Sequence, residues 1–249
     1  YIGGIFVLKS FCIKTNNQLI LNYLLNQFNQ NKPNYFHISK NSFKIYDNVI
    51  LHYSGTSYEM YYDYISGLLT NLIIHFYEEK LLSHLIHYNY FYFSELEEQE
   101  ILNNCINYLS SNNQDTVERK NIIFHLCKKY MKENKSVIID GLINFRLKEY
   151  TIKLDEILET CINTYIIEKE YVSFINLLKE YIDSKKPANE SLHLIYLNNE
   201  SLLLDNKKNV IHFETDISNS KYLSDITFSS NDYCLNTLLN ILPLKIYIH

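Results

Sequence analysis

Glycine and proline are scarce in this chain, at 5 and 3 of 249 residues, well below the usual shares of about 7% and 5%. Tight turns depend on these two residue types, so their scarcity argues against a many-stranded sandwich and favours long helices. The glycines also form neither the G-x-G-x-x-G pattern nor a P-loop. Both nucleotide-binding fingerprints are therefore missing from the sequence.

A long apolar run is missing as well. The most apolar stretch, YISGLLTNLIIHFY at 64–77, carries no charge but contains Ser, Thr, Asn and His. Spanning a bilayer takes about 20 mostly apolar residues, so we expect a buried helix here and no transmembrane segment. The five cysteines are widely separated, include no CxxC pair and follow no recognisable signal peptide. This pattern predicts reduced thiols and a cytoplasmic location.

The basic residues are almost all lysine, because arginine occurs only at positions 119 and 146. Tyrosine, asparagine and isoleucine are abundant and tryptophan is absent, which is typical of an AT-rich genome. Each arginine is more informative in such a composition, where lysine is the common choice. The formal net charge is −5, so the whole chain does not resemble a protein built to coat nucleic acid.

The hydrophobic pattern predicts an α+β fold that is predominantly helical. Residues 1–54 read as an N-terminal β-α-β-β portion, with the last two strands joined around KNS at 40–42. Residues 55–187 read as a central helical region. Residues 188–249 read as a hairpin at 192–205, a further strand at 209–213, a short helix at 231–242 and a final strand. We expect the two β-containing ends to share one sheet.

Helix signals are clearest in the central region. Ser94 and Glu97 have the spacing of a capping box. An apolar stripe with helical spacing runs from Leu154 to Tyr165. The charged residues 168–170 interrupt this stripe, which resumes at Phe174, so we expect a bend or break at 168–170.

Candidate metal and nucleophile sites are weak. His75, Glu79, His84 and His87 form pairs with i, i+4 and i, i+3 spacing, but the motif is not H-E-x-x-H and no other cluster supplies further ligands. Most cysteines lie on apolar helix stripes, where cysteine behaves as a small hydrophobic residue. The sequence therefore predicts no metal site, no cofactor and no catalytic residue.

The stretch RKNIIFHLCKKYMKENK at 119–135 is the best candidate for an anion-binding face. It could contact phosphates or an anionic membrane surface; a solvated helix face is the simpler interpretation. The aromatic stretch HYNYFYF at 87–93 is a partner site if exposed, and core between two helices if buried, which the composition favours. The basic residues of the candidate anion-binding face at 119–135 are Arg119, Lys120, Lys128, Lys129, Lys132 and Lys135.

Several features in order resemble the YtxC family of sporulation proteins from endospore-forming Firmicutes. They are FRLKEY at 145–150, the helix with IEKEYVSFINLLKEYI at 167–182, the hairpin HLIYLNNESLLLD at 193–205 and the terminal LPLKIYIH. The resemblance covers most of 85–249 and the N-terminal part only loosely. It implies a role in spore formation, and the family supplies no activity, ligand or catalytic residue that could be transferred.

Arg146 lies within this resemblance, and helical spacing places Glu149 at i+3 and Tyr150 at i+4. A guanidinium can pair with a carboxylate in two-pronged fashion and stack on a tyrosine ring, which lysine does less well. We expect Arg146, Glu149 and Tyr150 to form a structural clamp; the alternative is a contact with an anion or a partner's carboxylate.

Two hypotheses for function follow. The first is a non-enzymatic cytoplasmic factor in spore formation that acts through contacts with protein partners. The second is a nucleic-acid or membrane-surface binding module that uses residues 119–135. An enzyme remains a third class, because active sites can be assembled from dispersed residues.

Overall fold

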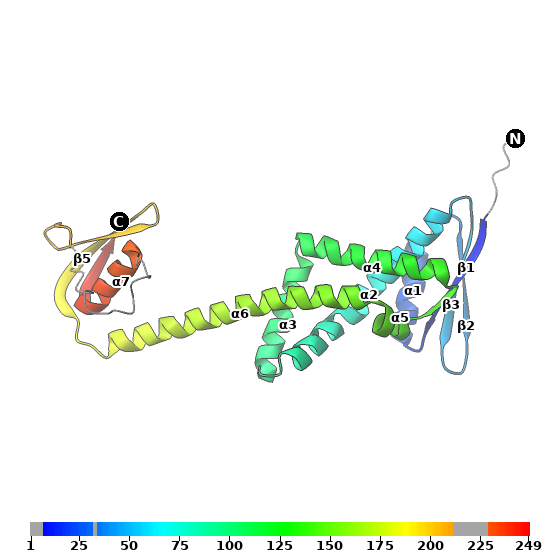
Figure 1. The fold of residues 1–249 in the computed structure, drawn as a ribbon, viewed down its shortest axis with the longest axis horizontal. Coiled ribbons are helices and arrows are strands. Elements are labelled where there is room, and N and C mark those ends of the chain that lie inside the picture. Colours follow the sequence, from blue (N-terminus) through cyan, green and yellow to red (C-terminus); the bar gives the residue numbers. More distant parts are fainter. Residues whose placement is uncertain (1–6, 32–33, 212–228) are drawn as a thin grey trace, which may run out of the picture. The chain divides into compact units, whose positions relative to one another are not determined.

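The computed structural model describes residues 7–31, 34–211 and 229–249 (Figure 1). The chain divides into two compact units, Tyr1–Ile167 (unit 1) and Glu168–His249 (unit 2). The division falls inside a helix and at neither of the boundaries expected from the sequence, residues 54 and 187. Within the described ranges, no helix has both the length and the apolar character needed to cross a membrane.

Unit 1 begins with the predicted β-α-β-β order. Its sheet contains β1 (Val7–Thr15), β2 (Phe36–Ser42), β3 (Asp47–Gly55) and β4 (Ser136–Ile138) in the order β2-β3-β1-β4. Strand β3 runs antiparallel to both β1 and β2, and β4 joins β1 in parallel. Helix α1 (Gln18–Gln30) connects β1 to β2, so these elements form a split β-α-β unit.

The turn between β2 and β3 lies later than expected. Strand β2 continues through the KNS stretch, and the turn spans Phe43 to Tyr46, where the Phe43 N–H donates to the Tyr46 carbonyl at 3.0 Å. Helices lie on one face of the sheet (Figure 1). The strands bury alternate side chains, including Phe11, Ile13 and Leu51. The alternation follows the two-residue period of a strand.

Four helices follow in unit 1. They are α2 (Tyr58–Asn89), α3 (Glu95–Ser110), α4 (Gln114–Glu133) and α5 (Ile139–Arg146). The predicted capping box opens α3, where the Ser94 N–H donates to the Glu97 carboxylate at 2.9 Å. Helix α4 is capped by Asn113, whose side-chain oxygen accepts from the Thr116 N–H at 2.7 Å. These caps fix where the helices start, because the first amides of a helix need outside acceptors.

Helix α6 (Lys148–Asp183) is continuous over 36 residues. The expected break at 168–170 is therefore wrong: Glu168, Lys169 and Glu170 end the buried stripe but not the helix. Lysine and glutamate are good helix formers, so they interrupt an apolar face at no cost to the backbone. The buried positions of α6 run from Tyr150 to Tyr165, and none follows.

Unit 2 adds β5 (Ala188–Leu197), β6 (Glu200–Leu204), α7 (Ser230–Ile241) and β7 (Pro243–Ile248). The predicted hairpin, short helix and final strand are confirmed. Asn198 and Asn199 make the hairpin turn with φ of 51° and 65°, which suits a two-residue turn with positive φ at both positions. Within 209–213, Val210 forms an isolated bridge with Leu204, and residues 212 and 213 lie outside the described ranges.

The described strands of the two ends form two sheets, so the expected shared sheet is wrong. The second sheet has the order β6-β5-β7, with β7 parallel to β5. In each sheet one pair of strands is a hairpin, β2–β3 or β5–β6. Closing such a short loop costs less entropy than pairing strands from the two ends of the chain.

Candidate functional site

A buried ion pair joins three helices of unit 1. Arg119 on α4 donates from Nη1 to Oε2 of Glu78 on α2. The same carboxylate oxygen accepts from the hydroxyl of Tyr150 on α6 at 2.8 Å. Only 4% of Arg119 is exposed. A buried charge is costly unless it is paired. The Arg119–Glu78 pair therefore favours the arrangement in which α2, α4 and α6 are packed together.

The remaining contacts of the cluster are also internal. Nη2 of Arg119 donates to the Leu109 carbonyl at 2.8 Å, near the end of α3. Its Nε is buried and has no hydrogen-bond partner among the described residues. Burial, and then the adjacent negative charge of Glu78, raise the pKa of Tyr150 well above its usual range. The tyrosine therefore remains a neutral donor, and the cluster is a structural clamp.

The guanidinium clamp expected at Arg146 is thus made by the other arginine. The expectation that Arg119 belongs to an exposed anion-binding face is wrong, because Arg119 shares the buried face of α4 with Thr116, Ile123 and Cys127. Its spacing of three and four residues from Thr116 and Ile123 was a readable signal.

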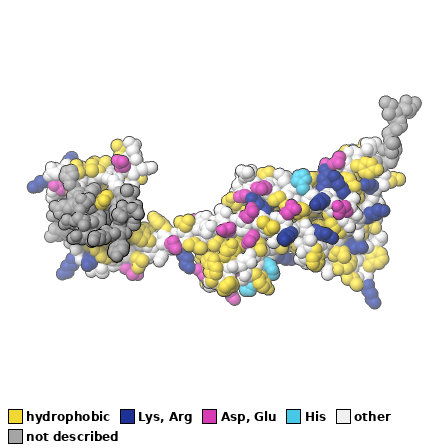
Figure 2. All heavy atoms as spheres, in the orientation of Figure 1, with side chains coloured by type: hydrophobic (Ala, Val, Ile, Leu, Met, Phe, Trp, Pro, Cys, Tyr) yellow, Lys and Arg dark blue, Asp and Glu magenta, His cyan; other side chains and the backbone are white. Residues whose placement is uncertain are grey.

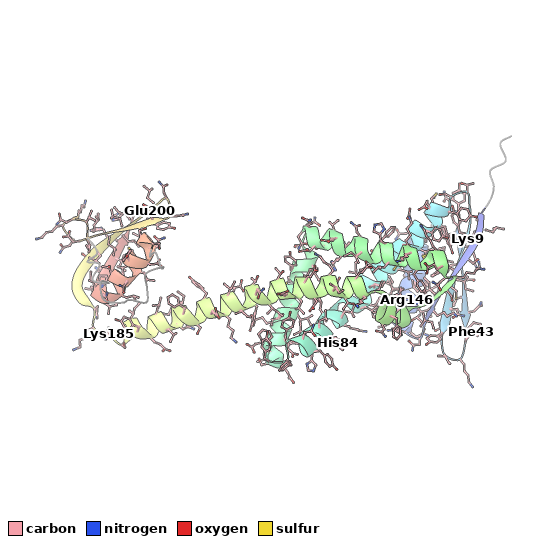
Figure 3. The ribbon with its side chains drawn as sticks, in the orientation of Figure 1. Lys9, Phe43, His84, Arg146, Lys185 and Glu200 are labelled. Atoms are coloured by element: carbon pink, nitrogen blue, oxygen red, sulfur yellow. The ribbon has the colours of Figure 1, made fainter. Side chains whose placement is uncertain are left out.

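The structure does not bring Arg146 together with Glu149 and Tyr150. Helix α5 ends at Arg146 and α6 starts at Lys148, so the expected i+3 and i+4 relationship is lost. Arg146 is exposed on α5 (Figure 3), and no hydrogen bond or ion pair joins it to another described residue. Asp140, in the first turn of the same helix, accepts from the Tyr77 hydroxyl at 2.7 Å.

The basic stretch 119–135 is less uniform than its sequence indicates. Arg119 is buried, and Lys128 lies 2.6 Å from the carboxylates of both Glu59 and Asp63. Lys132 is in the last turn of α4, where a cation compensates the negative end of the helix dipole. Four lysines of the stretch remain exposed: Lys120, Lys129, Lys132 and Lys135.

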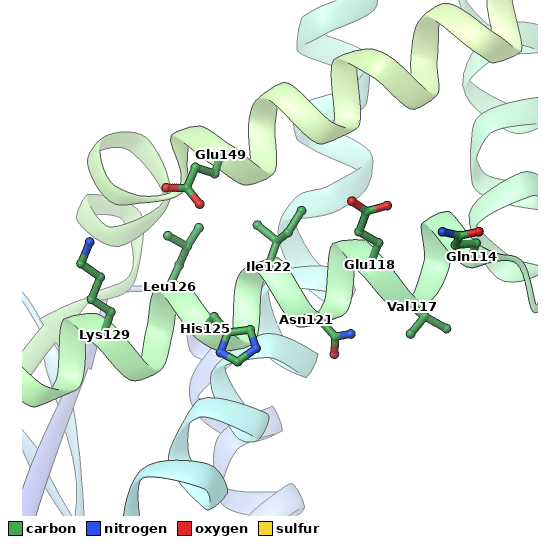
Figure 4. Close-up of a pocket in the computed structure, with 9 residues that line it drawn as sticks. All are labelled: Gln114, Val117, Glu118, Asn121, Ile122, His125, Leu126, Lys129 and Glu149. Carbon is green, nitrogen blue, oxygen red and sulfur yellow. The ribbon is translucent and has the colours of Figure 1, made fainter.

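A groove of about 530 Å³ runs along α4 and the start of α6. Figure 4 shows Ile122, Leu126 and Lys129 pointing from α4 toward α6, where Glu149 lies. His125 points away from α6, so the titratable side chains of the groove do not converge on one point. Glu149 and Lys129 both line this groove, whereas the Tyr150 hydroxyl donates to Glu78.

The histidine and cysteine candidates are dispersed. His75 stacks on Tyr23, with ring centroids 5.2 Å apart, and His87 lies 3.4 Å from Glu98. In the described ranges, no group of three or more His, Cys, Asp or Glu side chains is arranged to hold a metal ion. Burial raises the pKa of the Cys127 thiol to about 12. Such a thiol is not ionised at neutral pH and is a poor nucleophile.

The aromatic stretch 87–93 is only partly buried. Phe93 and Tyr90 pack against the core of unit 1, but Tyr88, Phe91 and Tyr92 are exposed. The expectation that the stretch is core is therefore wrong for these three. They lie at the end of α2 and in the turn before α3, where the chain leaves the core.

The described part of unit 2 exposes many apolar side chains. Its described residues bury only three hydrophobic side chains, Leu192, Leu203 and Cys234, whereas unit 1 has a large buried cluster. Figure 2 shows hydrophobic side chains on the visible surface of both units. An apolar groove of about 480 Å³ lies within unit 2. It is lined by Ile182, Pro187, Leu235, Leu238, Leu239, Leu242, Pro243 and Ile246, with Asp183 and Lys185 beside them.

A model of the YtxC-like family matches residues 63–249, which is well over half of the sequence. The chain belongs to the YtxC-like family. An uncharacterised protein, YtxC of Bacillus subtilis (strain 168), is 25% identical over 139 residues, which cover 53% of this chain and 50% of that protein. The matched part thus spans about half the length of that relative. No solved structure matches the chain.

The region matched to the YtxC-like family contains both features described above. Glu78, Arg119 and Tyr150 lie within it, as does all of unit 2. Strands β1, β2 and β3 and helix α1 precede it. The apolar surface of unit 2 is therefore part of the segment that defines membership of the family.

Proposed function

We propose that this protein acts in spore formation as a non-enzymatic cytoplasmic factor that works by binding other proteins. The resemblance to YtxC-like sporulation proteins supports the process. The apolar surface of unit 2 supports the mode of action. Contiguous apolar surface is costly to leave in water, and large exposed patches on soluble proteins mark sites of interaction.

Strand β7 is the part of this surface best suited to a protein partner. It is an edge strand of the sheet β6-β5-β7, so its outer backbone groups can pair with an added strand. Its side chains Leu244, Ile246 and Ile248 are all exposed. Pro243 and Lys245 on the same strand limit indiscriminate pairing, which favours a specific partner over aggregation.

The test is deletion of the gene in its spore-forming host, with counts of heat-resistant spores and of vegetative growth. We expect fewer spores at normal growth, and full rescue by the wild-type gene. A gene encoding Ile248→Glu should fail to rescue, because the charge would have to be desolvated in the contact with the partner.

The matched control is Ile45→Glu, which changes the same residue type at an exposed position of unit 1 and should rescue fully. Normal spore counts after deletion would contradict the role in spore formation. Rescue by Ile248→Glu would contradict the use of β7 while leaving that role intact.

The alternative function is binding of nucleic acid or an anionic membrane surface by residues 119–135. The observation in its favour is that Lys120, Lys129, Lys132 and Lys135 are exposed. Such binding should weaken steeply as salt increases, because counterion release drives it. An affinity for duplex DNA or anionic vesicles that does not change with salt would argue against it.

A further inference from the structure

A polar cavity of about 470 Å³ lies in unit 1 beside the first strand of its sheet. Residues 8–10 of β1 form one wall, and Tyr61 and Tyr62 on α2 form the second. The third wall is the end of α4 and the residues that follow it, 131–135. The volume is that of a small-molecule site, since such sites range from about 300 to 1,000 Å³.

The charge of the cavity walls is mostly positive. Lys9, Lys132 and Lys135 line the cavity, together with one carboxylate, that of Glu133. Within the described ranges, no ion pair joins any of these three lysines to a carboxylate. Lys128, earlier in α4, is by contrast paired with two carboxylates. The cavity therefore carries an excess of positive charge that the surrounding side chains do not balance.

Lys9 is held in place by aromatic side chains. It is half-buried, and its ammonium donates to the Tyr62 hydroxyl at 2.7 Å. The ammonium nitrogen also lies 4.5 Å from the ring centroid of Tyr58 and 4.7 Å from that of Tyr62. The rings attract the cation but leave its charge in place. Charges that are withdrawn from water are normally paired, so the partner that Lys9 lacks is an anion.

The edge of the sheet adds a backbone donor to the same wall. Strand β4 pairs with β1 only at residues 12–14, where the Cys12 N–H donates to the Lys135 carbonyl at 3.0 Å. Backbone N–H groups two residues apart on a strand point to the same edge. The Ser10 N–H therefore points to the edge that β4 occupies further along, at a position ahead of the paired residues. Open sheet edges of this kind form anion-binding concavities.

We propose that this cavity binds a small anion of the phosphate class that carries several negative charges. Ammonium groups are compact charges with rotatable donors and bind phosphate oxygens in this way. Three ammoniums line the cavity from β1 and from residues 132–135, so a diphosphate group can meet more than one of them. The site goes beyond the binding of protein partners by unit 2 and does not depend on it. Unlike contact of an exposed helix face with nucleic acid, it requires Lys9.

The test is equilibrium dialysis of the purified full chain against labelled pyrophosphate. A buffer with about 150 mM NaCl screens attraction between exposed charges more than about 8 Å apart, so binding then requires close contacts. We expect saturable binding of one pyrophosphate per chain. Lys9→Gln should weaken it about tenfold or more, because a hydrogen bond between charged groups is lost. A wild-type chain that binds no pyrophosphate at millimolar concentration would overturn the proposal.

Two further variants separate the cavity from general surface charge and from misfolding. Lys135→Gln changes an exposed side chain and leaves the tyrosine contacts of Lys9 intact, so it should weaken binding several-fold at the wild-type melting temperature. The matched control is Lys120→Gln, which removes an exposed lysine of α4 that does not line the cavity and should bind as the wild type does. Wild-type affinity in both Lys9→Gln and Lys135→Gln, or equal weakening in Lys120→Gln, would overturn the assignment to this cavity. The outcome is independent of spore counts.

Discussion

The two halves of α6 are built from similar side chains but meet different surroundings. From Tyr150 to Tyr165 the apolar face of the helix is buried in the core of unit 1. From Tyr171 to Ile182 no side chain of the helix is buried, and Ile175 and Leu178 are only half-buried. The same contrast holds for the units as a whole, because unit 1 has an extensive core and the described part of unit 2 has three buried hydrophobic side chains.

This difference teaches that an amphipathic pattern identifies a face but not its partner. A covered face contributes to the stability of its own chain, roughly in proportion to the area removed from water. An uncovered face contributes nothing until a partner arrives. Substitutions in unit 1 should therefore change folding, and substitutions on the apolar surface of unit 2 should change association.

The largest effect is expected at Arg119. Arg119→Met removes the guanidinium and leaves the Glu78 carboxylate without its buried partner, which should lower the free energy of unfolding by about 3–5 kcal/mol. Arg146→Met changes the chain's other arginine, which is exposed, and should alter it by less than about 0.5 kcal/mol. Urea unfolding measures both.

The pairing with Glu78 can be checked separately. The double variant Arg119→Met, Glu78→Leu should recover part of the loss, because no charge is then left buried. If Arg119→Met and Arg146→Met lowered the free energy of unfolding by the same amount, the contrast between a buried clamp and a surface residue would be refuted.

A smaller effect separates the halves of α6. Leu154→Ala removes a fully buried side chain and should cost about 2–5 kcal/mol through lost transfer energy and a cavity. Leu177→Ala, at an exposed position of the same helix, should cost less than about 0.5 kcal/mol in a dilute sample. Thermal melts of both variants give the comparison, and similar losses would mean that the second half is covered within a single chain.

The smallest effect is a pH dependence in unit 1. The hydroxyl of Tyr108, 2.6 Å away, and then the ammonium of Lys153, 3.0 Å away, lower the pKa of Asp115 below its usual value. A depressed folded-state pKa adds stability that is present above the unfolded-state pKa and is lost as pH falls through the folded-state pKa. Melting temperatures should therefore fall as pH drops below about 5.

Two variants isolate this contribution. Tyr108→Phe removes the first cause of the depressed pKa and should reduce the slope of melting temperature against pH, and Asp115→Asn should reduce it further. A slope equal to that of the wild type in Asp115→Asn would show that other groups cause the acid sensitivity.

Local patterns predicted the element order well. The capping box at Ser94 and Glu97 and the asparagine turn at 198–199 are set by neighbours in the sequence, so they could be read directly. The continuity of α6 at 168–170 could not, because charged residues that interrupt an apolar stripe are also good helix formers. Whether such residues end a helix depends on backbone hydrogen bonds that the side-chain pattern does not reveal.

The site was harder to predict than the fold. Arg146, Glu149 and Tyr150 have helical spacing, but a helix end at Leu147 separates them, and a boundary of one residue is below what propensity can locate. The charge of Arg119 favours an exposed position, whereas its spacing places it on the buried face of α4. Its partner Glu78 lies 41 residues away, and contacts at that range come from tertiary packing.

The continuity of α6 has a consequence for how the chain acquires its structure. Starting a helix is the costly step, because several residues must be ordered before the first hydrogen bond forms, whereas lengthening an existing helix adds one bond for each residue ordered. The core of unit 1 holds the first half of α6 and so supplies the nucleus. The second half, from Glu168 onward, lengthens the same helix. It therefore needs no nucleus of its own to become helical.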